Sequence, residues 1–175
     1  MASRESNDER VRAIASDQPG VGDHRYRLYT IAWQRVCEAS EAGYYLEAIT
    51  LLESLIADRL ESRASYLTGE NEGFSNLGPL IRTFRKHETV QAFRDLIERL
   101  DSWRKKRNTA LHEVVKLEHG PLPSWEKQTA SLPSIVQVGK DLLREFADLD
   151  EVERAKVGKI PATSPNAFPI VPRSR

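Results

Sequence analysis

The sequence has one cysteine, no net charge and no long apolar run, and each absence excludes a class of protein. The lone Cys37 cannot form an intramolecular disulfide, which favours a reducing compartment. The 26 basic and 26 acidic residues cancel, so any attraction to a polyanion must come from local clustering. No run approaches the roughly 18 apolar residues of a membrane span, and the polar start of the chain has no apolar signal region. We therefore expect a cytoplasmic protein that contacts no membrane.

Several catalytic motifs are also missing. The segment 68–79 contains three glycines but no Gly-Lys-Ser/Thr ending, so it is not a phosphate-binding loop. No G-x-S-x-G is present, and without a predicted parallel sheet a dinucleotide site is excluded. The chain has only four histidines beside its one cysteine, at spacings that do not suit a metal site: His24, His87, His112 and His119. We expect no metal and no cofactor.

What the sequence does contain is helical periodicity. Its 175 residues suffice for one domain with a core, and 30% charged with 7% aromatic residues suits a helix-rich protein. Apolar residues recur at three-to-four spacing, which predicts an all-α fold, an antiparallel bundle of four to five helices. The expected helices are Tyr26–Ala42, Tyr44–Leu67, Leu80–His87, a long one from Glu88 towards Gly120, and Ser124–Ala155.

The apolar stripes assign roles to these helices. The widest stripe belongs to 44–67, which predicts a central helix buried from two sides. Pro133 should kink the last helix or delay its start. A loose N-terminal arm over 1–24, a helical domain over 25–156 and a proline-rich disordered tail over 157–175 complete the expected organisation. The stripe expected for the first helix consists of Leu28, Ile31, Ala32, Val36 and Ala39.

The segment from Glu88 is unusually long for one helix, about 31 residues or some 46 Å. Asp101-Ser102 and Asn108-Thr109 are both suitable N-caps. The segment is therefore either one helix or two helices that meet between 101 and 109.

A basic cluster, Arg104-Lys105-Lys106-Arg107, lies within this segment. Arg104 and Arg107 occupy positions where the spacing requires core residues, and burying an unpaired guanidinium is costly. Three explanations stay open at this point. The solvent-facing side can rotate or the helix can break, an acidic neighbour such as Glu61 can pair with the cluster, or a polar cleft can receive an anion.

His112 adds chemistry to the cluster. Histidine acts as a general acid or base near neutrality, and arginine binds phosphate bidentately, a combination suited to cleaving RNA. Asn108 and His112 share a helix face, but Arg107 and His112 are about 140° apart on a regular helix. A distorted turn, or a dimer that brings two such helices together, would let both act on one phosphate.

These residues resemble a known family. Arg107-Asn108-Thr109-Ala110-Leu111-His112 is similar to the R-x4–6-H signature of HEPN domains (higher eukaryotes and prokaryotes nucleotide-binding), with asparagine after the arginine. A second match runs from Arg82 to His87, but we favour the later one because it has Asn108 and precedes a final packing helix. The resemblance covers about residues 26–150.

The resemblance implies a small all-α fold, a homodimer with a composite cleft, and metal-independent endoribonuclease activity in a toxin–antitoxin or phage-defence system. It implies that His112 is the general acid/base, that Arg107 stabilises phosphate charge and that Asn108 orients His112 or the phosphate. We expect Arg104, Lys105 and Lys106 to bind RNA. Other members of the family are inactive, so the alternative is a non-catalytic nucleotide- or protein-binding module, an antitoxin or a scaffold. A third alternative is a purely structural bundle with a solvated cluster.

Overall fold

The computed structural model describes residues 19–70, 73–116, 120–121 and 123–156. Within these residues every regular element is a helix, which confirms the all-α prediction. Most of the predicted arm, and all of the tail over 157–175, lie outside them. No described helix has the length and apolar character needed to cross a bilayer. The helices are α1 Val21–Glu41, α2 Tyr45–Thr68, α3 Leu77–His87, α4 Gln91–Glu113, α5 Trp125–Thr129 and α6 Leu132–Lys156.

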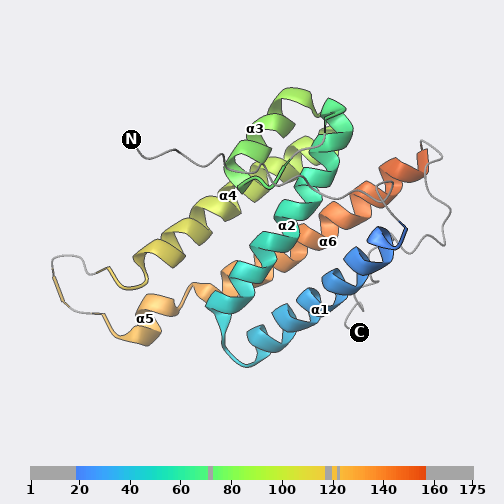
Figure 1. The fold of residues 1–175 in the computed structure, drawn as a ribbon. Coiled ribbons are helices and arrows are strands. Elements are labelled where there is room, and N and C mark those ends of the chain that lie inside the picture. The colour runs from blue at the N-terminus through green and yellow to red at the C-terminus, as the bar shows by residue number, and fades with distance from the viewer. Residues whose placement is uncertain (1–18, 71–72, 117–119, 122, 157–175) are drawn as a thin grey trace, which may run out of the picture.

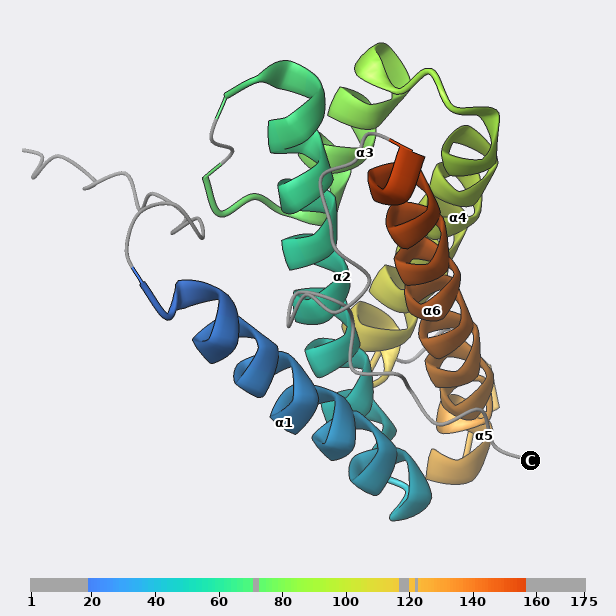
Figure 2. The same cartoon turned by 90° about the vertical axis from the view of Figure 1, so that its right-hand side faces the viewer.

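Helix α2 lies at the centre of the bundle, as its wide apolar stripe predicts. It packs against α1, α3 and α6, while α4 packs against α3 and α6 (Figures 1 and 2). The core includes three phenylalanines, and Phe146 of α6 makes edge-to-face contacts with Phe84 of α3 and Phe93 of α4. Helices far apart in sequence therefore share one core.

The face that helix α1 buries overlaps the predicted one only in part. It begins at Val21, before the expected start, and Leu28 and Ile31 are 54% and 64% exposed. Tyr29 and Trp33 are buried in their place, together with the expected Val36 and Ala39. The predicted and the observed faces both have three-to-four spacing. The observed face includes Tyr29, whose hydroxyl can be buried because it has a hydrogen-bond acceptor on α2. The Tyr29 hydroxyl donates to the Leu55 carbonyl of α2 at 2.6 Å.

Helix α4 is continuous through the predicted break. The two candidate capping sites are both inside it, so the two-helix alternative is wrong. Ser102 donates its hydroxyl to the Glu98 carbonyl at 3.0 Å instead of capping a new helix. The Asp101 carboxylate is occupied by cations, as described below.

The last segment divides into α5 and α6, and Pro133 is the second residue of α6, as a late start predicts. Trp103 of α4 fixes this helix against α4, because its indole nitrogen donates to the Ile135 carbonyl at 2.8 Å. A Cβ at Gly139 would lie 2.9 Å from the Trp103 ring. Glycine at this position therefore permits the close approach of α4 and α6.

A buried ionic network fixes the N-terminal end of α4. Arg63 of α2 donates to both oxygens of Glu88, at 2.9 and 3.2 Å, and its guanidinium lies 4.0 Å from the Phe93 ring centre. Asp150 of α6 is 3.9 Å away. Glu88 also accepts from the backbone N–H groups of Thr89 and Val90. Arg154 of α6 lies 2.7 Å from the other Asp150 oxygen and supplies the second cation. The network thus ties α2 to α6 and to the α3–α4 corner, with two cations for two carboxylates.

Candidate functional site

The basic cluster lies in the second half of α4, and its first two members are organised by Asp101. Arg104 donates two hydrogen bonds to one Asp101 oxygen, at 2.7 and 2.9 Å, and Lys105 lies 3.0 Å from the other oxygen. Arg85 of α3 also contacts this carboxylate, at 3.1 Å. Burial alone would raise the pKa of Asp101, but the hydrogen bonds from these three cations outweigh it and lower the pKa to about 2.

Arg107 is buried, with 8% of its surface exposed. Its guanidinium forms an ion pair with Glu53 of α2, so the acidic partner is Glu53 and not the Glu61 suggested by the sequence. Glu61 instead accepts a hydrogen bond from the Ser75 backbone. The Nε of Arg107 is buried and has no hydrogen-bond partner within the described residues. Burial lowers the pKa of this guanidinium, which nevertheless stays protonated.

His112 lies on the other side of α4 and is exposed, whereas Asn108 is half-buried. Arg107 points to α2 and His112 to solvent from one continuous helix, so a single chain does not bring them to the same phosphate. A distorted turn, one of the two solutions open from the sequence, is absent because α4 is regular here. The Arg82-to-His87 match ends on an exposed His87 at the end of α3.

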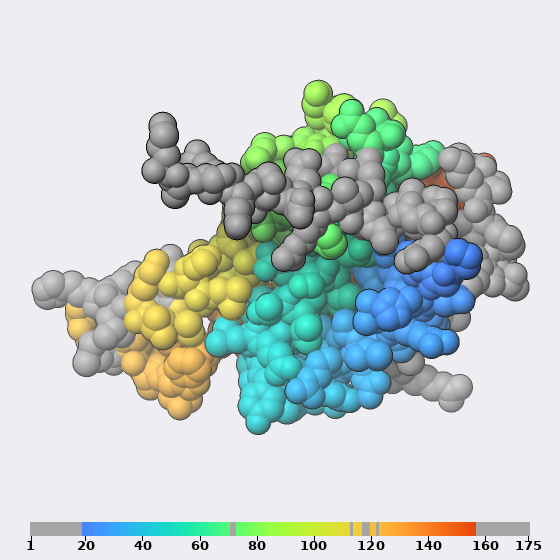
Figure 3. All heavy atoms as spheres, in the orientation of Figure 1, coloured from blue at the N-terminus to red at the C-terminus, as the bar shows by residue number. Residues whose placement is uncertain are grey.

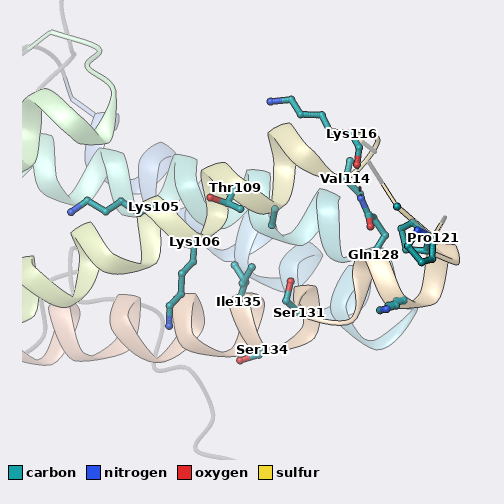
Figure 4. Close-up of a pocket in the computed structure, with 14 residues that line it drawn as sticks. Lys105, Lys106, Thr109, Val114, Lys116, Pro121, Gln128, Ser131, Ser134 and Ile135 are labelled. Carbon is teal, nitrogen blue, oxygen red and sulfur yellow. Dashed lines mark hydrogen bonds between the residues drawn. The ribbon is translucent and has the colours of Figure 1, made fainter. Parts of the chain in front are cut away.

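A cavity of about 1180 Å³ opens beside this half of α4. Its walls come from α4, from the chain after α4, from α5 and from the start of α6. At this end of the molecule α4 and α5 lie together, away from α1 (Figure 3). In Figure 4, Lys106 extends from α4 towards α6, while Lys105 and Lys116 lie towards opposite ends of the cavity. We call it the lysine cavity after its charged lining residues, Lys105, Lys106, Lys116 and Lys127.

The cavity lies between the two predicted catalytic positions on the helix circumference. At about 100° per residue, its α4 lining from Lys105 through Thr109 to Val114 spans roughly half of the helix. His112 falls just outside one edge of this arc, and Arg107 falls just outside the other. The predicted RNA-binding residues Lys105 and Lys106 line the cavity, but Arg104, Arg107, Asn108 and His112 do not.

Sequence reasoning missed several residues of this site. The role of Asp101 could have been predicted, because it precedes Arg104 by three and Lys105 by four positions, the spacing of ion pairs on a helix. Glu53 carries no such signal, since its pairing with Arg107 depends on how α2 and α4 are positioned. Lys116 lies three positions after α4, within the segment expected to be helical, but was not named as a site residue. Lys127, Ser131 and Ser134 lie on later segments that no local pattern relates to α4.

Comparison with known proteins identifies no relative. No family model, no curated protein and no solved structure matches the chain. The HEPN resemblance accordingly stays a prediction that rests on residues 107–112 and on the order of the helices. Among the described residues, no three His, Cys, Asp or Glu side chains are grouped so that they could hold a metal ion.

Proposed function

We propose that this chain is a metal-independent endoribonuclease that works as a pair of chains. The observation that carries the proposal is the position of His112, which is exposed on α4 at the edge of the lysine cavity. Among the described residues that line this cavity, every charged one is a lysine. A general acid or base must reach its substrate from solvent, and RNA is held near protein mainly by cations on its phosphates.

The chemistry follows from the groups present. One His112 imidazole removes the 2′-OH proton, the 2′ oxygen attacks the adjacent phosphorus, and the bond to the 5′ oxygen breaks. That oxygen takes up the proton that His112 removed, so the imidazole is neutral again and the products carry a 2′,3′-cyclic phosphate and a 5′-OH. Arg107 would stabilise the charge on the phosphorane. The setting implied by the resemblance is a toxin–antitoxin or phage-defence system.

The Arg107–Glu53 ion pair sets a condition for this mechanism. Arg107 can stabilise the phosphorane only if it leaves Glu53 or binds a phosphate while still paired, because it is buried on the opposite side of α4 from His112. A second copy of the chain, with its own His112 facing this Arg107, would supply the missing neighbour. Dimer formation is therefore part of the proposal.

Cleavage of bulk RNA in EDTA tests the proposal. We expect His112→Ala to reduce the cleavage rate by about 10²- to 10⁴-fold, the usual contribution of a general acid or base. His87→Ala is the matched control, because His87 is also exposed and ends the other Arg-to-His match. Equal cleavage by the wild type and His112→Ala would contradict the assignment, as would products that lack a cyclic phosphate.

The second candidate is a non-catalytic RNA- or partner-binding module of the same fold. The engagement of Arg107 by Glu53 favours it, because an arginine held by a carboxylate is not available to a phosphate. Under this candidate the wild type and His112→Ala are both inert on RNA, and both still bind it or a protein partner.

A further inference from the structure

The lysine cavity is strongly positive. Its lining contains four lysines and no acidic residue among the described residues. Where the structure describes both side chains, only Lys105 of these four has an acidic partner, Asp101, which it shares with two arginines. The ammonium groups of Lys106, Lys116 and Lys127 make no ion pair within the described part of the chain. These lysines are spread along the hollow (Figure 4) and leave it with an excess of positive charge, so an anionic ligand that contacts several of them would be stabilised.

The lining also indicates the chemistry of that ligand. Lysine binds phosphate as a point charge, without the planar geometry that an arginine would impose. Three hydroxyl groups, on Thr109, Ser131 and Ser134, add neutral donors suited to phosphate and sugar oxygens. None of the described residues that line the cavity is aromatic, so they offer no surface on which a base could stack. The cavity therefore suits a phosphate backbone and not a nucleobase.

The size of the cavity and the spread of the lysines favour a chain of phosphates over a single one. From Lys105 to the end of α4 at Glu113 the helix rises by about 12 Å, and Lys116 lies beyond that point. One phosphate group cannot contact both ends. A volume of about 1180 Å³ exceeds the roughly 300–1,000 Å³ of pockets for drug-sized ligands. A hollow of this kind admits a single strand more readily than a duplex, whose phosphates lie on a wide convex surface.

We infer that the lysine cavity between α4 and the α5–α6 segment holds the phosphate backbone of single-stranded RNA without reading its bases. The choice of RNA rests on the proposed function, whereas the phosphate chemistry rests on the cavity alone. A strand held here passes His112 at the edge of the α4 lining. The cavity would thus retain the substrate beside the cleaved bond, independently of its sequence.

The test measures binding with a strand that cannot be cleaved. A fluorescein-labelled 12-nucleotide 2′-O-methyl oligouridylate lacks the attacking hydroxyl, so its affinity does not depend on catalysis. The test variant is the full chain with Lys106→Gln, Lys116→Gln and Lys127→Gln. Its matched control has Lys86→Gln, Arg94→Gln and Lys140→Gln, which remove the same charge from surfaces outside the cavity.

The salt dependence of binding gives the sharpest readout. Each lost phosphate contact should reduce the slope of log K against log salt by about 0.7 for a single strand, so the cavity variant should lose about 2 units of slope. It should also bind at least about tenfold more weakly at 0.1 M salt, whereas the control keeps the wild-type slope. Oligoadenylate and a DNA strand of the same length should bind within about threefold of the oligouridylate, because only phosphates are read.

Three results would overturn the inference. The first is that the wild type does not bind the strand at low salt. The second is that the cavity and control variants lose affinity and slope equally. The third is that the wild type prefers one base by more than tenfold. None of these depends on cleavage. If His112→Ala and the wild type are both inert on RNA but the slope falls as expected, the cavity assignment stands and the nuclease assignment fails. If cleavage requires His112 but the slope is unchanged, the reverse holds.

Discussion

Two buried arginines on different helices show how differently the two ends of this bundle are built. Arg63 of α2 has 5% of its surface exposed and Arg107 of α4 has 8%, so both guanidinium groups are largely removed from water. Arg63 is surrounded by Glu88, Asp150 and the Phe93 ring. Among the described residues, Arg107 has one acidic partner, and its Nε has no hydrogen-bond partner.

The partners also differ in their access to water. The Glu88 side chain is 1% exposed, whereas the Glu53 side chain is 28% exposed. A carboxylate without access to water depends on its cation, but one near the surface can exchange that cation for solvent. The end around Arg63 therefore has the properties of a structural network. The end around Arg107, next to the lysine cavity, has the properties of a site that can change its contacts.

The largest expected effect comes from breaking the structural network. Arg63→Met leaves Glu88 buried without its cation, which should reduce the free energy of unfolding by about 3–5 kcal/mol. Urea denaturation followed by circular dichroism measures this loss. Arg99→Met is the matched control, since it breaks an exposed pair with Glu145 and should cost less than about 1 kcal/mol. Similar losses for the two variants would remove the structural role assigned to Arg63.

A smaller, pH-dependent effect is expected at Asp101, between the two ends. Folding lowers the pKa of this carboxyl to about 2, so its contribution is complete above the unfolded pKa of about 3.9 and is lost as pH falls through the folded value. Asp101→Asn should cost about 2 kcal/mol at pH 7, and the difference from the wild type should shrink below pH 4. Urea denaturation at several pH values measures this. Exposed Asp148→Asn should show no such dependence, and a constant difference for Asp101→Asn would be contrary to this account.

The smallest effect on stability is expected at Arg107. Arg107→Met should change the free energy of unfolding by no more than about 1 kcal/mol, because Glu53 can turn to water and the unpaired Nε disappears. The same urea measurement, set beside Arg63→Met, gives the comparison directly. A loss of 3 kcal/mol or more would make Arg107 a second structural cation and would favour the non-catalytic candidate.

The fold could be predicted where burial follows hydropathy alone. The central helix was predicted to within a residue at each end, because its apolar stripe is wide. The face of α1 was missed because Tyr29 is buried through a hydrogen bond to α2, which hydropathy does not reveal. The break expected in α4 is absent for a similar reason. The Asp101 carboxylate pairs with cations, and the Ser102 hydroxyl donates to the Glu98 carbonyl within the same helix, so neither side chain caps a new helix.

The site could be predicted only in part. Position and residue type on α4 identified Lys105 and Lys106, which do line the cavity. The pairing of Arg107 with Glu53 and the position of Lys127 depend on how segments distant in sequence meet, and no spacing rule contains that information. The homodimer and the RNA ligand stay predictions, tested by the experiments on His112 and on the lysine cavity.

Glu88 has a consequence for how the α3–α4 corner moves. Its carboxylate accepts both from the backbone at the start of α4 and from Arg63, which is 25 positions earlier in the chain. Opening the corner would take Glu88 away from Arg63 and leave only Asp150, 3.9 Å away, as its counter-ion among the described residues. The loss of this buried, hydrogen-bonded pair makes local opening of the corner costly. Amide hydrogens at Thr89 and Val90 should accordingly exchange with solvent only when the bundle opens as a whole. The Glu88 side chain thus makes the turn between α3 and α4 unfold together with the rest of the bundle.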